Sequence, residues 1–177
     1  MNSFAIFTDV SLNPGRKLGV GAYLAVPASF IEASPRSIER SAEAERLVIR
    51  RFEDTSSTRL EVQTVLWALE DFRNESKDER PAKLQLYSDS QCVAGLLRRR
   101  HGLEAKGFFS SCTRREIKIA SLYRKFYEFH DKLEFEVIKV AGHSRSCCRD
   151  TVHRMFLFVD RKARRALNHW LGELEQE

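Results

Sequence analysis

Apolar runs separated by polar turn residues predict a sheet along much of this chain. Five runs are expected to be strands: residues 4–9, 19–26, 46–53, 83–88 and 133–140. The first is a nearly continuous apolar run, as in a strand buried on both faces, and the turn residues Asn13, Pro14 and Gly15 follow it. The second run is expected to return antiparallel through that turn. The last alternates between apolar and polar positions, as a half-buried strand does.

Other segments show apolar residues at helical spacing. Helices are expected over residues 56–72, 90–100, 113–130 and from 152 to the end. In the first of these, Thr58 and Glu61 fit a capping box, in which the glutamate bonds back to the helix start. Residues 27–45 contain two prolines and four glutamates and are longer than a hairpin needs, so they are interpreted as an insertion.

Length and composition favour one domain over residues 1–177, since a chain of this size can bury a single core. There is no apolar run of about 18 residues, the length that a membrane span requires. The first residues lack the basic and apolar segments of a secretory signal, so we expect an intracellular, cytoplasmic protein. We also expect it to be a monomer. The four cysteines lack paired spacing, which argues against a disulfide framework, and a zinc cluster of His143, Cys147, Cys148 and His153 is the less favoured interpretation.

The net charge of +5 is concentrated in one segment. Residues 98–132 hold ten Lys or Arg against four Asp or Glu, a net of +6, so the rest of the chain is about neutral. Such a local positive field favours a polyanion such as nucleic acid. A merely solvated helix face is the alternative.

Acidic residues stand at the ends of two predicted strands, Asp9 after the first and Asp89 after the fourth. Ligands of open α/β sheets bind outside such strand ends. If the two strands are neighbours, their carboxylates repel each other and need a cation between them. Asp160 falls beside the apolar stripe of the last helix, where an ion pair with Arg164 one turn later is the simpler interpretation.

The order strand-Asp, helix-Glu, strand-Asp, loop-His and helix-Asp resembles the type 1 ribonuclease H family. The matching segments are residues 7–15, 58–61, 87–91 and 140–144, followed by Val159 and Asp160. The resemblance implies an α/β, ribonuclease H-like fold: a mixed five-stranded sheet, three antiparallel strands and then parallel ones, with helices on both faces. It also implies an endonuclease that cuts the RNA strand of RNA/DNA hybrids and leaves 5′-phosphate and 3′-hydroxyl ends.

The same resemblance implies a metal site in which Asp9, Glu61, Asp89 and Asp160 hold two Mg²⁺ ions, with Mn²⁺ as a substitute. Hard oxygen ligands suit these ions. His143, on a loop after the last strand, would move a proton or help the product leave.

Further positions match residues that contact the hybrid, and residues 98–118 match the family's basic protrusion. The expected substrate-binding residues are Asn13, Ser56, Ser57, Thr58, Gln91, Arg98, Arg99, Arg100, Lys106 and Phe108. Val10 stands where the family often has glycine, and Ser57 and Thr58 replace asparagines. A related metal-dependent DNA nuclease or resolvase, and a catalytically silent duplex-binding module, therefore stay open as alternatives.

Overall fold

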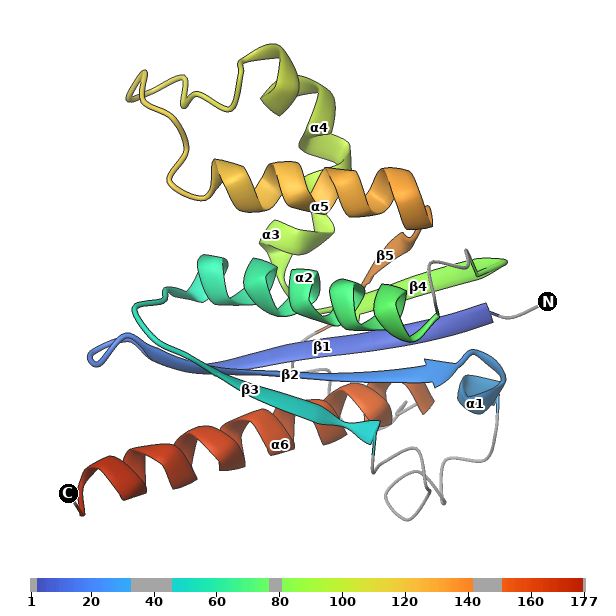
Figure 1. Ribbon diagram of the computed structural model, residues 1–177, viewed down its shortest axis with the longest axis vertical. Coiled ribbons are helices and arrows are strands. Elements are labelled where there is room, and N and C mark those ends of the chain that lie inside the picture. The colour runs from blue at the N-terminus through green and yellow to red at the C-terminus, as the bar shows by residue number, and fades with distance from the viewer. Residues whose placement is uncertain (1–2, 33–45, 77–80, 142–150, 177) are drawn as a thin grey trace.

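A five-stranded mixed sheet forms the centre of the computed structural model, which describes residues 3–32, 46–76, 81–141 and 151–176. The strand order is β3-β2-β1-β4-β5 (Figure 1). The strands are β1 (Ser3–Asn13), β2 (Leu18–Pro27), β3 (Val48–Phe52), β4 (Lys83–Ser88) and β5 (Glu136–Lys139). The first three pair antiparallel, and β1 with β4 and β4 with β5 pair parallel, which confirms the predicted sheet.

Helices cover both faces of the sheet, as Figure 1 shows. The helices are α1 (Ser29–Glu32), α2 (Ser57–Glu75), α3 (Gln91–Ala94), α4 (Leu96–Ala105), α5 (Ala120–Leu133) and α6 (Thr151–Leu174). The long helix α6 lies against one face, and α2 lies against the other with α5 packed beyond it. Alternate residues of β1 therefore enter different cores: Ile6 packs with α2 and α5, and Phe7 with α6.

The central strand continues past Asp9, whereas the sequence predicted that it would end there. β2 pairs with β1 as far as Asn13 and Leu18, because the tight turn begins only after Asn13. On the other side, β4 pairs with β1 only up to Phe7 and Tyr87. Asp9 is therefore inside its strand but just beyond the last residue that β4 covers.

The basic segment folds differently from the prediction. The helix expected over 113–130 begins only at Ala120, and the helix expected over 90–100 is divided at Gly95 into α3 and α4. Between α4 and α5 the chain forms turns with one isolated bridge between Phe109 and Glu116. Phe108 and Arg114 have φ angles of 62° and 52°, a left-handed conformation that interrupts a helix.

Two more predicted elements start or end elsewhere. The strand expected over 133–140 is Glu136–Lys139, because Leu133 still belongs to α5 and Glu134 follows in the left-handed region with φ 48°. The strand expected over 46–53 is Val48–Phe52. The predicted insertion at 27–45 includes the end of β2 and helix α1, and its remaining residues lie outside the described part of the chain. None of the described helices is long and apolar enough to cross a membrane.

Close contact between α2 and β2 supplies a test of this packing. A Cβ atom on Gly21 would lie 2.1 Å from the Thr64 hydroxyl oxygen, inside van der Waals contact. Gly21→Ala should therefore lower the free energy of unfolding by roughly 1–3 kcal/mol, the usual cost of overpacking, as measured by urea denaturation. Gly172→Ala is the matched control, since a Cβ there would meet nothing within 4 Å. Equal stability of the two variants would contradict the packing described.

Candidate active site

The Asp9 carboxyl lies at the centre of the acidic cluster. Asp9 is only 9% exposed and lies on β1, beyond the last residue of that strand that pairs with β4. Burial, the charge of Asp89, and the hydrogen bond and charge of Asp160 raise the pKa of Asp9 from 3.8 to about 8, although the Val10 backbone N–H acts in the opposite direction. Carboxyl groups from β1, from the end of β4 and from α6 therefore meet here.

Asp160 combines the two interpretations that its sequence position left open. The Arg164 Nε donates to Asp160 Oδ1 at 2.8 Å, so the predicted ion pair is present on α6. The same carboxyl is also hydrogen-bonded to Asp9. Arg164 thus places a fixed positive charge beside the acidic cluster, and sequence analysis had not assigned it to the site.

Glu61 reaches the cluster through a serine. Its Oε2 accepts a hydrogen bond from Ser90 Oγ at 2.5 Å, and its Oε1 accepts one from Ser57 Oγ at 3.3 Å. Ser90 is the residue after Asp89, and its Oγ also accepts from the Val93 N–H as the N-cap of α3. The bond therefore joins α2 to the end of β4, next to Asp89.

Of the two interpretations of Glu61, as a partner of Thr58 in a capping box and as a residue of the acidic site, the structure does not show the capping box. The N-cap of α2 is Ser56, which makes no side-chain capping bond. Glu61 bonds to Ser57 and Ser90 instead, because the end of β4 offers a hydroxyl close to its carboxylate.

The cluster has the chemistry of a site for hard divalent cations. Asp9, Asp89 and Asp160 offer only carboxylate oxygens, the ligands that Mg²⁺ and Mn²⁺ prefer, and Glu61 lies next to them through its bond to Ser90. Burial, and then the neighbouring charges of Asp89 and Asp160, raise the pKa of Asp9, and a bound cation would favour its ionised form. Within the described ranges, no three His, Cys, Asp or Glu side chains are already grouped as a metal site, so the carboxylates would have to draw closer around an ion.

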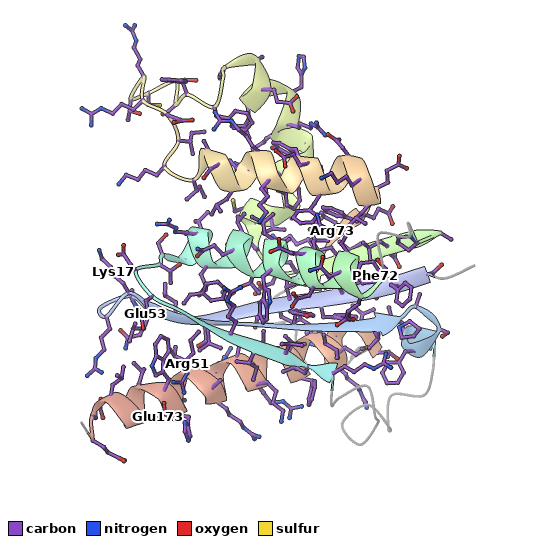
Figure 2. All side chains as sticks on the ribbon, in the orientation of Figure 1. Lys17, Arg51, Glu53, Phe72, Arg73 and Glu173 are labelled. Atoms are coloured by element: carbon purple, nitrogen blue, oxygen red, sulfur yellow. The ribbon has the colours of Figure 1, made fainter. Side chains whose placement is uncertain are left out.

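Several predicted substrate-binding residues lie together beside the turn between β1 and β2. The Asn13 side-chain oxygen accepts from the Arg16 backbone N–H at 3.0 Å, which holds the turn. The Thr55 N–H donates to the Lys17 carbonyl at 3.1 Å, so the turn is tied to the start of α2, where Ser56, Ser57 and Thr58 are exposed. Figure 2 shows Lys17 and Glu53 at this end of the molecule.

A cleft lies between this turn and helix α6. It has a volume of about 470 Å³ and lies between residues 11–15 and one side of α6. Arg164 and Asn168 line it from the helix. Neither was predicted from the sequence, although their spacing of four residues places both on the face of α6 that carries Asp160.

The three consecutive arginines of the basic segment have different environments. Arg98 is exposed and, within the described part of the chain, makes no hydrogen bond or ion pair. Arg99 donates back to the carbonyls of Cys92 and Gly95 at 2.9 and 3.1 Å. Arg100 forms ion pairs with Glu104 and Asp131. Of the three, Arg98 is the one whose charge is turned to solvent without a protein partner.

The adjacent side chains of Phe108 and Phe109 also differ in their exposure to solvent. Phe108 was expected to contact substrate, but it is 7% exposed and packs in the core under the Arg124 guanidinium, 4.5 Å from the ring centroid. Phe109 is 51% exposed and is the aromatic side chain available to a ligand. Lys106 donates to Ser111 Oγ at 2.9 Å within the same segment.

Gln91 has a partner that sequence analysis missed. Lys139, at the end of β5, donates its ammonium to the Gln91 side-chain oxygen. Alternation within the predicted strand could have placed Lys139 at the site edge, but not against Gln91. His143 lies outside the described residues, as do Cys147 and Cys148 of the less favoured zinc cluster, and His153 is buried on α6.

Comparison with known proteins identifies the fold and the family of the chain. The RNase H family model matches residues 1–166. Among solved structures, LC9-RNase H1, a type 1 RNase H with the type 2 active-site motif, superposes with a TM-score of 0.65 at 18% identity, covering 93% of this chain and 72% of that one. A foamy viral protease-reverse transcriptase in complex with dsDNA has a TM-score of 0.59 at 10% identity, covering 92% and 93%. No curated protein sequence matches the chain. The match over most of its length shows that the chain belongs to the RNase H family.

Proposed function

We propose that this ribonuclease H enzyme is an endonuclease that cuts the RNA strand of RNA/DNA hybrids by a two-metal-ion mechanism. The observation that supports it best is the convergence of Asp89 and Asp160 on a buried Asp9 whose pKa is raised to about 8. A buried carboxyl group beside two other carboxyl groups is typical of sites that bind divalent cations. The products would be 5′-phosphate and 3′-hydroxyl ends.

Each acidic residue has a defined part in the proposed mechanism. Asp9, Glu61, Asp89 and Asp160 would hold the divalent ions. When bound, such ions would supply a lower pKa for the attacking water and charge stabilisation for the leaving 3′ oxygen. Ser90 orients the Glu61 carboxylate, and Arg164 limits the rotation of Asp160. His143 would move a proton near the leaving group or assist product release.

Substrate binding would rest on backbone and groove contacts rather than on base sequence, as is usual for duplexes that contain RNA. The exposed N-terminus of α2 offers backbone N–H groups and hydroxyls to a phosphate. Asn13 and Gln91 would face the minor groove, while Arg98 and Phe109 would contact the DNA strand. Arg164 and Asn168 would extend the contact along the cleft beside α6.

A panel of labelled substrates tests the proposal directly. We expect cleavage of an RNA/DNA hybrid with Mg²⁺ or Mn²⁺, no cleavage with EDTA, and a loss of at least about a hundredfold in kcat for Asp9→Asn or Asp89→Asn, because each removes a charged metal ligand. Duplex DNA, duplex RNA and single strands are the comparison arms. Cleavage of duplex DNA in preference to hybrid would favour a DNA nuclease or resolvase, and binding of hybrid without cleavage under any metal would favour a silent duplex-binding module.

The raised pKa of Asp9 predicts how stability depends on pH. Without divalent ions the folded protein holds a proton that the unfolded chain releases, so the free energy of unfolding should fall as pH rises from about 4 to about 8 and then level off. Asp9→Asn has no such proton to lose, so its stability relative to the parent should increase across this window. Urea denaturation in EDTA at several pH values measures the difference.

The matched control is Asp131→Asn. Arg100 holds the pKa of this exposed carboxyl below its ordinary value, so it is ionised in both folded and unfolded chains above about pH 5. Its effect on stability should be constant from about pH 5 to about pH 8. A parallel pH dependence of the parent and Asp9→Asn would show that Asp9 is not the buried acid described.

The unequal arginines supply another test. Arg98→Gln should raise KM for hybrid and reduce the slope of log affinity against log salt by about 0.9, the value for one phosphate contact. Arg100→Gln should leave that slope unchanged and lower the free energy of unfolding by about 1 kcal/mol or less, as expected for a surface ion pair. Binding titrations at several salt concentrations compare them. An unchanged slope in Arg98→Gln would remove this side chain from the substrate path.

A further inference from the structure

Lys139 and Gln91 form a polar pair at the edge of the candidate site. Lys139 ends β5 and pairs in register with Ser88, the residue before Asp89. Gln91 begins α3, two residues after Asp89. The Lys139 ammonium donates to the Gln91 side-chain oxygen, and both residues are exposed. The pair therefore joins two elements on the rim of the acidic cluster.

The partner determines which way the Gln91 amide points. A lysine ammonium can only donate hydrogen bonds, so the side-chain oxygen of Gln91 must face it. The two N–H donors of the same amide are then directed away from Lys139. The opposite arrangement occurs between β4 and β5, where Gln85 Nε2 donates to Glu136 Oε2 at 3.3 Å. At that position a carboxylate partner holds the amide nitrogen inward.

The Lys139–Gln91 pair is expected to contribute little to the free energy of unfolding. Exposed hydrogen bonds and charges contribute little to stability, and immobilising a lysine side chain costs entropy. The pair instead fixes the orientation of the Gln91 amide. Without a partner, this amide can turn its donor or its acceptor side towards a ligand with similar ease. The lysine removes that freedom before a ligand arrives.

We propose that Lys139 is a positioning residue that presents the Gln91 amide donors to the minor groove of the hybrid, an inference that rests on the proposed function. Each base pair carries purine N3 or pyrimidine O2 acceptors in that groove, and the ribose 2′-hydroxyl accepts as well. A donor fixed outward can therefore bind whatever the sequence. If the Gln91 side-chain oxygen pointed outward instead, it could not donate a hydrogen bond to these acceptors.

The alternative role for Lys139 is direct attraction of a phosphate, and two measurements separate the roles. Loss of a phosphate contact lowers the salt slope of binding by about 0.9, whereas loss of an orienting bond leaves the slope unchanged. In a double-mutant cycle, a phosphate contact acts equally with or without the Gln91 amide, while a positioning effect disappears once that amide is removed.

The test measures the dissociation constant of a labelled RNA/DNA hybrid in EDTA, so that it does not depend on cleavage. Lys139→Arg should bind within about twofold of the parent, since it keeps a donor towards Gln91. Lys139→Met should weaken binding about fivefold, and Lys139→Glu more, because a carboxylate would turn the amide nitrogen inward. In a Gln91→Ala background, Lys139→Met should add less than about twofold, with the salt slope unchanged in both backgrounds. Lys83→Met, at the opposite end of β4, is the matched control and should bind as the parent does.

Each outcome decides the inference. Additive effects in the cycle, a reduced salt slope in Lys139→Met, or parental binding by Lys139→Glu would overturn it while leaving the proposed nuclease activity intact. If the parent binds no hybrid and cleaves none with Mg²⁺ or Mn²⁺, both the inference and the proposed function fail. Parental cleavage combined with the predicted cycle supports both.

Discussion

The constraint on which the candidate site depends is the burial of a carboxyl group beside other carboxyl groups. β4 stops pairing with β1 at Phe7, which leaves Asp9 on a strand that β2 still holds straight. The neighbouring acids then come from the end of β4 and from α6, and their charge adds to the cost of desolvation. The fold tolerates the free-energy cost of burying Asp9 beside other acids because the surrounding sheet and helices hold the strand in place.

Small polar contacts connect this acidic centre to the elements around it. Ser90 bonds to Glu61 and caps α3, so a single hydroxyl links α2, the end of β4 and the helix that begins at Gln91. Arg164 bonds to Asp160 and lines the cleft that leads to the β1–β2 turn. The same bonds therefore position the acidic residues and the residues beside them, as preorganised sites require.

Positive charge is used in two ways on this protein. Many basic side chains serve the fold. Arg100 pairs with Asp131, and Arg51 lies over the Trp170 ring and pairs with Glu173 at 2.7 Å. Arg51 and Glu173 are labelled in Figure 2, on β3 and α6. Others, such as Arg98, are turned to solvent. A count of basic residues thus locates the charged segment but overstates how much of it is free to attract a polyanion.

The sequence by itself determined which segments form most of the strands and helices, because apolar periodicity and turn residues are local signals. The order of the acidic residues was also readable from it, and their resemblance to the ribonuclease H family implied the mixed sheet with helices on both faces. Tertiary structure alone decided that Asp9 lies inside its strand, that Glu61 bonds to Ser90 rather than capping its helix, and that Phe108 is buried while Phe109 is exposed. It also decided which arginine is paired and that Lys139 faces Gln91. These outcomes depend on contacts between residues that are distant in the chain. Packing across the sheet determines which of these contacts form, and no short stretch of sequence contains that information.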